Sequence, residues 1–425
     1  MEPGDLQMPA PVSTAEPGPP LVLRGGRIID PSTGQDAPAD LTMANGTIVD
    51  PMATPEPPTD APTTIDVSGC VVVPGAIDLH AHVMEGLGNF CLAPDAPGVD
   101  QGVPTVVDGG TSGWATFDIA RRAVIDHPET RSRILAFIDP NALYLATKDF
   151  ICHKLEIAND LRNLNADELA ASLERNADVV VGLKVRVTHT GDPEVSPFLD
   201  AAKEATDLPI MVHLGRFPHT PVIPPRRLLE ALRPGDIVTH AFRGYGGLVS
   251  SEGAVVPEFR EAVQRGVILD VGHSGTDFRF REARRLFEQG YIPDTISTDL
   301  NIFNVGGPVF SLAETASKFL ALGLDLTDVI PMITTNPAWA IQRSATLGSL
   351  EPGRGADATV FRVVDGPTRF NDGEEEVIGD QRLLPVGCVR NGHWIPTPEL
   401  PTYATAGKTW VRSGGGSAYS EDEDW

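Results

Sequence analysis

Short apolar runs rich in β-branched residues recur along the middle of the chain and alternate with segments of helical periodicity. Eight such runs occur, centred near Ile77, Val106, Leu135, Leu183, Val212, Val238, Leu269 and Ser297. Neighbouring centres lie about 26–31 residues apart, with one longer step before Lys184. Helical patterns such as DELAASLERN and REARRLFEQG stand between them. This alternation is typical of βα units.

Eight βα units predict an α/β fold in which the parallel strands close into a (β/α)8 TIM barrel, which we place at residues 71–345. The alternative is an open doubly wound sheet. That fold would be favoured by a glycine-rich phosphate loop after the first barrel strand, and the sequence has none there.

The two ends of the chain follow a different pattern, in which apolar runs alternate with Gly, Asn and Asp turns. We therefore predict a small β-sandwich domain formed by the N- and C-terminal segments 21–70 and 346–396. Residues 1–20 are rich in proline and polar side chains and predict a disordered leader. Residues 397–425 combine a Gly/Ser stretch with an acidic tip and predict a partly mobile tail.

The charge of the chain excludes two classes of partner. Lys and Arg number 33 against 58 Asp and Glu, which gives a net charge of -25. Because such a field repels phosphate backbones and anionic membranes, we expect no nucleic-acid or membrane binding. The four cysteines are scattered without a C-x-x-C pair, which indicates reduced thiols. Without a signal sequence or a long apolar run, the chain is expected to be cytoplasmic.

Side chains able to bind a metal follow the predicted barrel strands where those strands end, which in such barrels is the active-site face. They are His80, His82, Lys184, His213, His240, His273 and Asp299. The first two form an H-x-H pair, whose rings share one face of a strand because side chains alternate. A lone H-x-H pair is more often two structural histidines bonded to backbone carbonyls than a metal site. Ligands from several strands that converge on one barrel mouth favour a catalytic metal site.

Lys184 is the unusual member, because an ammonium beside cations would be repelled. Burial lowers a lysine pKa and frees the amine. A neutral amine can react with carbon dioxide to form a carbamate, which would turn this side chain into a bridging carboxylate. The alternative is a lysine held in a salt bridge.

The motifs together resemble the amidohydrolase superfamily. The opening PGAIDLHAH, the strand VGLKVR, the segment GPVFSLAETASKFLALG and the strand PDTISTDL are similar to its amidohydrolase/deacetylase group of metal-dependent hydrolases, often labelled dihydroorotase-like. The resemblance extends from GGRIIDPSTG near the start to LGSLEPGRGADATVF near the end. It implies self-association, so we expect a homo-oligomer.

The resemblance also implies a binuclear site, usually zinc. In that site the more buried metal would be bound by His80, His82 and Asp299, and the outer metal by His213 and His240. A carboxylated Lys184 and a hydroxide would bridge the two metals.

The same resemblance implies a mechanism. The metal-bridging hydroxide attacks the acyl carbon, and Asp299 accepts its proton and returns it to the leaving group. His273 would either hydrogen-bond the developing oxyanion or support its neighbours.

The substrate is indicated by one departure from the dihydroorotase pattern. Such enzymes usually carry an arginine two residues after the H-x-H pair, and here Met84 stands there. This favours a deacetylase-like hydrolase that cleaves an amide or ester acyl bond of a small, carboxylate-bearing molecule. Arg186, Arg216 and Arg243 are candidates to bind the anion, or they form surface ion pairs. The alternatives are a cyclic amidohydrolase of the dihydroorotase, hydantoinase or dihydropyrimidinase kind and a catalytically silent scaffold.

Overall fold

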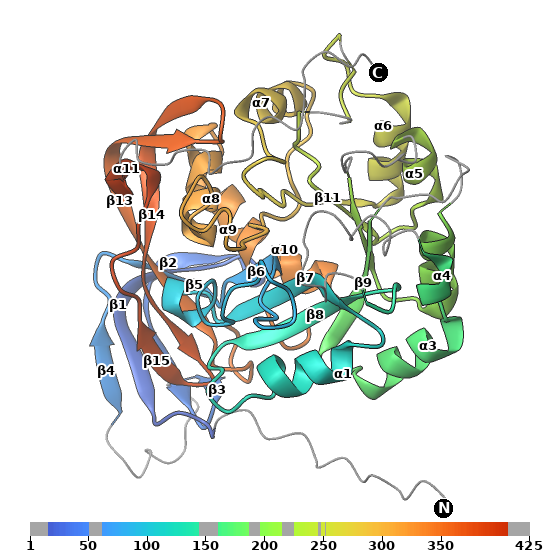
Figure 1. The fold of residues 1–425 in the computed structure, drawn as a ribbon. Coiled ribbons are helices and arrows are strands. Elements are labelled where there is room, and N and C mark those ends of the chain that lie inside the picture. The colour runs from blue at the N-terminus through green and yellow to red at the C-terminus, as the bar shows by residue number, and fades with distance from the viewer. Residues whose placement is uncertain are drawn as a thin grey trace, which may run out of the picture.

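The computed structural model (Figure 1) describes most of the chain. The described residues are 16–50, 62–143, 160–186, 196–214, 225–244, 248–250 and 252–406. Residues 1–15 of the predicted leader and 407–425 of the predicted tail lie outside the described residues. The domain boundaries predicted above stay predictions.

A parallel sheet of seven strands forms the centre of the molecule, and its strands follow one another in chain order. Every neighbouring pair is parallel. In order they are β6 (Ile77–Ala81), β7 (Thr105–Gly113), β8 (Arg133–Asp139), β9 (Val180–Arg186), β10 (Ile210–His213), β11 (Ile237–Thr239) and β12 (Ile268–Leu269).

The eighth predicted strand forms no ladder. Its residues instead join the two edges of the sheet through single parallel bridges, from Thr295 to Asp270 and from Leu300 to Ala81. Side-chain bonds replace part of the ladder here, because the Thr298 hydroxyl and amide both bind the Asp78 carboxylate. The sheet is therefore a curled, barrel-like structure whose gap is filled by the segment before Asp299.

Most helices lie outside the parallel sheet and follow its strands, as the alternation predicts (Figure 1). The helices are α1 (Phe117–Ala120) with the π-helical turn η2 (Arg121–Ile125), α3 (Ala166–Arg175), α4 (Pro197–Ala205), α5 (Pro225–Ala231), α6 (Pro257–Arg265), α7 (Phe280–Glu288), α8 (Leu312–Ala321), α9 (Leu326–Ile333), α10 (Thr335–Ala340) and α11 (Tyr403–Ala406). The 3-10 turns are η1 (Val99–Gln101) and η3 (Leu161–Asn163). In the described ranges no helix combines the length and apolarity needed to cross a bilayer.

The barrel interior holds a compact apolar cluster with at least one side chain from each of the seven parallel strands. It includes Leu79, Val107, Phe137, Val181, Met211, Ile237 and Ile268, and residues of α10 complete it. A larger cluster fills the space between the sheet and its helices. Because the strands are held from both faces, their ends present side chains at fixed positions.

A separate mixed sheet is built from both ends of the chain. It has eight strands in the order β15-β14-β13-β5-β1-β2-β3, with β4 paired to β1. Where the sequence predicts a sandwich, the strands join in one continuous sheet, and β13 pairs antiparallel with β5. Their bounds are β1 (Leu21–Asp30), β2 (Gln35–Ala44), β3 (Thr47–Val49), β4 (Thr63–Asp66), β5 (Val71–Pro74), β13 (Ala358–Asn371), β14 (Glu376–Arg390) and β15 (His393–Pro396).

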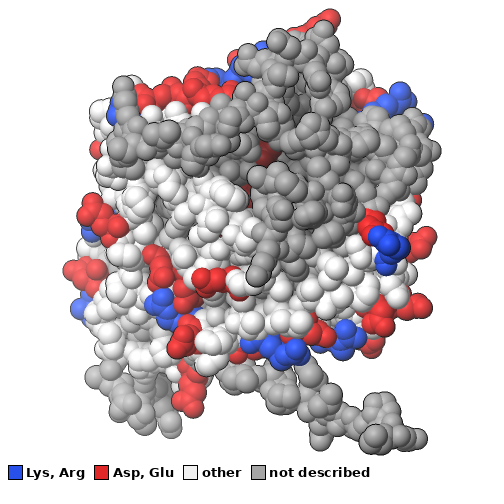
Figure 2. All heavy atoms as spheres, viewed as in Figure 1, with Lys and Arg blue, Asp and Glu red and all other residues white. Residues whose placement is uncertain are grey.

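Figure 2 shows acidic side chains spread over the described part of one face of the molecule, with fewer basic ones among them. This agrees with the net charge of -25. The ends of the parallel strands therefore belong to an acidic protein, and the charged side chains close to those ends determine the local electrostatics.

Candidate metal centre

The strand ends bring the predicted ligands together at one end of the parallel sheet. His80 lies in β6, Lys184 in β9 and His213 at the end of β10, while His240 follows β11 directly. One ligand atom each of His80, His240 and Asp299 lies within 4.8 Å of the others, which is compact enough to hold one cation. The structure thus contains a candidate metal site of the kind that the strand-end pattern predicts.

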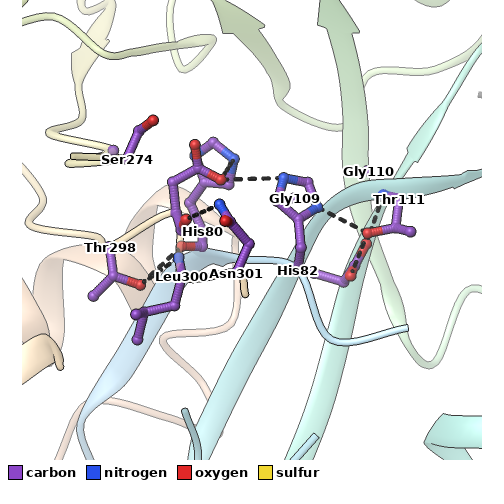
Figure 3. A network of polar contacts seen from close by, with 12 residues as sticks. His80, His82, Gly109, Gly110, Thr111, Ser274, Thr298, Leu300 and Asn301 are labelled. Carbon is purple, nitrogen blue, oxygen red and sulfur yellow. Dashed lines mark hydrogen bonds and ion pairs between the residues drawn. The ribbon is translucent and has the colours of Figure 1, made fainter. Parts of the chain in front are cut away.

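The remaining predicted ligands border this group. His82 Nε2 lies 3.1 Å from Asp299 Oδ1, and His80 Nε2 lies 3.4 Å from the same oxygen (Figure 3). The ring centroid of His213 is 4.3 Å from that of His240. Lys184 Nζ is 3.0 Å from His80 Nε2. All six side chains predicted as ligands therefore meet in one buried cluster.

Two of these residues have an unusual backbone conformation. His240 has a φ of 65° and Asp299 a φ of 53°, both in the left-handed region. This conformation costs an L-residue about 1–2 kcal/mol. Such strain persists where the surrounding fold over-determines it, and it gathers at functional sites. The backbone at these two strand ends is bent in a way that places the side chains in the cluster.

Two glycines of β7 make room for the cluster. A Cβ atom at Gly109 would lie 2.2 Å from His80 Cδ2, and one at Gly110 would lie 2.4 Å from Lys184 Cβ. Gly110 also has a φ of 81°. Any larger residue at either position would push into a ligand side chain.

The buried position of Lys184 changes its acid–base behaviour. Burial first, and then the Arg186 guanidinium, lower the pKa of Lys184 to about 7, while Asp299 and Asp270 act against the change. A large share of this amine is therefore neutral near pH 7. A neutral amine is the form that can react with carbon dioxide.

The histidines are held neutral as well. Burial lowers the pKa of His82 and His240, and it lowers the pKa of His80 and His213 well below the usual value. Neutral imidazoles keep a lone pair for coordination. Burial acts to raise the pKa of Asp299, but its positively polarised neighbours outweigh burial and the net pKa is lowered. The cluster is thus made of electron-pair donors and an anion.

These donors fit a cation. His240 Nε2 and Asp299 Oδ1 are buried and find no hydrogen-bond partner in the described part of the chain. The 3.1 Å separation of His82 Nε2 and Asp299 Oδ1 meets the distance for an ion pair, but its geometry makes no hydrogen bond. Nitrogen and oxygen lone pairs that face each other in a dry site are stabilised by a shared metal ion.

The predicted anion-binding arginines have internal partners. Arg186 Nη1 lies 3.0 Å from Asp139 Oδ2, and Arg243 Nη2 lies 3.1 Å from Asp277 Oδ1. Arg216 falls outside the described residues. The alternative interpretation was surface ion pairing; Arg186 and Arg243 do pair with carboxylates, but in the interior of the protein. A role in substrate binding stays a prediction.

His273 lies at the end of the segment after β12, as predicted, but its ring contacts a different group of residues. Its Nε2 atom is 2.6 Å from Lys318 Nζ, and its Nδ1 atom accepts a hydrogen bond from the Gly275 amide. Both ring nitrogens are therefore engaged within the protein. This arrangement agrees better with support of its neighbours than with contact to an oxyanion, and both roles stay predictions.

Several polar residues behind the ligands escaped the sequence analysis. They are Thr111, Asp108, Thr239 and Asp270, all buried. The two aspartates stand within the predicted strand runs VPTVVDGG (103–110) and VILDVGH (267–273), and the two threonines stand beside a glycine pair and a histidine. An aspartate inside an otherwise apolar strand run was the feature of the sequence that could have identified Asp108 and Asp270.

The fold and the cluster together define a class: α/β-barrel proteins that hold a histidine and carboxylate centre at the carboxyl ends of their strands. The family model described as amidohydrolase family matches residues 258–385. A deacetylase of Agrobacterium fabrum is 34% identical over 328 residues, which cover 75% of this chain and 77% of that protein. A deacetylase of Enterococcus faecalis is 31% identical over 309 residues, which cover 69% of this chain and 78% of that protein. The chain therefore belongs to the amidohydrolase family.

Solved structures agree with this assignment. A dihydroorotase superposes with a TM-score of 0.77 at 28% identity, and an adenine deaminase with a TM-score of 0.78 at 25% identity. Both comparisons cover 89% of this chain and 99% of the other chain. The predicted α/β fold class and the predicted superfamily are confirmed.

Proposed function

We propose that the protein is a metal-dependent hydrolase that cleaves the acyl bond of a small amide or ester, in the manner of a deacetylase. The observation that carries the proposal is the cluster of His80, Asp299 and His240, whose ligand atoms lie within 4.8 Å of one another. Deacetylase relatives over three quarters of the chain support the reaction class.

The proposed centre holds two divalent metal ions, with zinc favoured because its usual ligands are imidazole and carboxylate. The ligands would be His80, His82, Lys184, His213, His240 and Asp299, with Lys184 as its N6-carboxylated form. When bound, the metals would supply Lewis acidity toward the substrate carbonyl and toward water. The lowered pKa of Lys184, about 7, supports the carboxylated form, because the neutral amine is the reactive one.

Asp299 is the residue placed to move the proton. Its carboxylate is buried among the imidazoles, and its pKa is lowered, so that it is anionic at neutral pH. It would accept a proton from water as the water oxygen bonds to the acyl carbon. It would then give that proton to the leaving nitrogen or oxygen as the C–N or C–O bond breaks, which yields a carboxylic acid and an amine or alcohol.

A second candidate function is the ring opening of a cyclic amide. The similarity to a dihydroorotase structure favours it. Met84 disfavours dihydroorotate as the substrate, because a fully buried thioether stands where dihydroorotases usually carry an arginine. We therefore place the acyclic amide or ester first.

A metal-controlled substrate screen tests the proposal. The full chain is stripped with chelator, reloaded with zinc, and assayed against N-acetyl amino acids, O-acetyl hydroxy acids and cyclic ureides. We expect release of acetate that depends on reloading and a metal content of two per chain. Full activity in the stripped protein would contradict the metal proposal, and turnover of cyclic ureides alone would favour the second candidate.

A further inference from the structure

His80 is held from behind by a short polar chain. Its Nδ1 atom lies 3.1 Å from Thr239 Oγ1, and this hydroxyl donates its hydrogen to Asp270 Oδ2 at 2.7 Å. A hydroxyl has a single hydrogen, so toward His80 it can only accept. The imidazole must then carry its proton on Nδ1.

His82 is held in the same way by an unrelated pair of residues. Its Nδ1 atom lies 2.8 Å from Thr111 Oγ1 (Figure 3), and this hydroxyl donates to Asp108 Oδ2 at 2.8 Å. Because the single hydrogen of the Thr111 hydroxyl goes to Asp108, its oxygen can only accept a hydrogen bond from His82 Nδ1. Two strands that are not neighbours in the sheet, β7 and β11, thus each supply a threonine hydroxyl that accepts a hydrogen bond from one of the two histidines.

The two carboxylates are fixed in turn by further hydrogen bonds that they accept. Asp270 also accepts hydrogen bonds from the hydroxyls of Thr295 and Ser297, each at 2.7 Å. Asp108 also accepts from the backbone amides of Thr111 at 2.7 Å and Val83 at 3.0 Å. Each carboxylate is fully buried. The direction of each threonine hydroxyl therefore follows from the hydrogen-bond network around it.

His240 also carries its proton on Nδ1, but its partner there is a backbone carbonyl instead of a threonine. Its Nδ1 atom lies 2.6 Å from the carbonyl oxygen of Gly272, and a carbonyl has no hydrogen to give. Its Nε2 atom is left without a partner in the described part of the chain. Three imidazoles from two strand ends, those of β6 and β11, thus turn the same nitrogen toward the centre.

We propose that the pairs Thr239–Asp270 and Thr111–Asp108 are positioning residues that keep the proton of His80 and of His82 on Nδ1, so that Nε2 stays available to a cation. The proposal rests on the proposed metal-dependent function, and it assigns four residues a role that sequence analysis did not give them. Partners behind metal-binding histidines commonly set the tautomer and the ring orientation.

The experiment compares four single variants. Thr239→Val and Thr111→Val each remove a hydroxyl while keeping the shape of the side chain. Thr239→Ser restores the hydroxyl. Thr295→Val is the matched control, because Thr295 donates to the same Asp270 carboxylate at the same 2.7 Å but contacts no histidine among the described contacts.

The first readout needs no metal. In metal-free protein labelled with ¹⁵N-histidine, the nitrogen signals of His80 and His82 report which atom carries the proton. We expect a protonated Nδ1 at both in the unaltered chain and in Thr295→Val. Thr239→Val should free the proton of His80 alone, and Thr239→Ser should restore it. An unprotonated Nδ1 in the unaltered chain, or an unchanged His80 in Thr239→Val, would overturn the proposal.

The second readout is zinc affinity, measured by competition with a chromophoric chelator. Loss of such a partner commonly weakens metal binding about 10–100-fold. We expect that loss for Thr239→Val and for Thr111→Val, and a change of less than about threefold for Thr295→Val, which lacks the contact to a ring. Equal losses for Thr239→Val and Thr295→Val would overturn the positioning role. A protein with the expected tautomers that binds no zinc would instead contradict the proposed function and leave the positioning pairs intact.

Discussion

Lys184 and Lys318 are the two fully buried lysines of the described chain, and their surroundings are alike at first sight. The amine of Lys184 is 3.0 Å from His80 Nε2, and the amine of Lys318 is 2.6 Å from His273 Nε2. Burial lowers the pKa of the first to about 7 and of the second to about 8. Burial and an imidazole neighbour are therefore not enough to define a metal centre.

The difference lies in what else surrounds each amine. Lys318 donates to the carbonyl oxygen of Pro308 at 2.7 Å, and the Glu314 carboxylate offers it a negative neighbour. His273 beside it accepts from the Gly275 amide. Each of these polar groups has a partner in the described part of the chain, so the group needs no further ion.

Around Lys184 the acceptors are in excess. His240 Nε2 and Asp299 Oδ1 lack partners in the described part of the chain, and His80 turns its Nε2 toward the amine. Among the described residues, Lys184 Nζ makes polar contacts with an imidazole nitrogen and with the Met211 sulfur, at 3.4 Å. This comparison shows that unmatched lone pairs, and not the buried amine itself, distinguish the candidate metal centre from a structural cluster.

The largest expected effect comes from removing the amine itself. Lys184→Ala should lower hydrolytic activity by more than about 100-fold, since loss of the proposed bridging ligand should exceed the loss of a partner behind a ligand. Added short carboxylic acids should restore part of the activity by occupying the space of the proposed carbamate. Steady-state rates with and without acetate or propionate measure both effects. The matched variant Lys203→Ala, on α4 outside the cluster, should keep its rate; an active Lys184→Ala would contradict the bridging role.

The glycines beside the two lysine clusters give the next largest effect. In Gly109→Ala the new methyl group would meet the His80 ring at 2.2 Å, so we expect zinc affinity to fall by about 100-fold or more. Gly275→Ala adds a methyl group beside Pro308 at 3.0 Å and at a φ of 89°, which should cost about 1–2 kcal/mol of stability.

Chelator competition and thermal unfolding separate the two glycine variants. Gly109→Ala should lose metal, and Gly275→Ala should lose stability while it retains metal. Equal zinc affinity in both variants would show that the Gly109 position does not control the His80 ring.

The sequence predicted the candidate metal ligands better than the residues that hydrogen-bond to them from behind, and the reason is geometric. In a parallel barrel all strands end on the same face, so residues such as His80, Lys184 and Asp299 can be grouped without knowing any distance. The pairing of Thr239 with Asp270 depends on how two neighbouring strands are staggered, which strand-end position does not specify. The contact between His273 and Lys318 joins a strand end to helix α8. The periodicity of the sequence does not predict a contact between two such separate elements.

Contacts between distant segments, which the sequence pattern does not encode, also explain why the eighth predicted strand forms no ladder. PDTISTDL has the composition of a strand, but its hydroxyls bind buried carboxylates, and its second-last residue, Asp299, has a left-handed backbone conformation. Local propensity therefore predicted a ladder that side-chain hydrogen bonds partly replaced.

The pH dependence of reactivation gives a moderate effect that separates Lys184 from an ordinary lysine. With a pKa of about 7, the neutral fraction rises from about a tenth at pH 6 to about nine tenths at pH 8 and then levels off. At a fixed concentration of dissolved carbon dioxide, the initial rate of reactivation of stripped, carbon dioxide-depleted protein by zinc should rise about tenfold over that range and reach a plateau. A rate that keeps rising tenfold per pH unit up to pH 9 would indicate an unperturbed amine.

Lys318 should give the smallest effect, and it should appear in stability instead of activity. Because the folded protein lowers its pKa to about 8 from 10.5, mainly through burial, the unfolded chain binds more protons between these values. The free energy of unfolding should therefore rise with pH from about 8 to 10.5, by up to about 3 kcal/mol for this group.

Lys318→Met removes this titration while leaving the candidate metal centre untouched. Urea unfolding at intervals between pH 7 and 10.5 should show the free energies of the two proteins diverging as pH rises, because the gain is confined to the unaltered chain. Zinc content should be the same in both. Parallel stability curves would mean that Lys318 stays charged in the folded state, held by Glu314, and that the two buried lysines differ in protonation as well as in their surroundings.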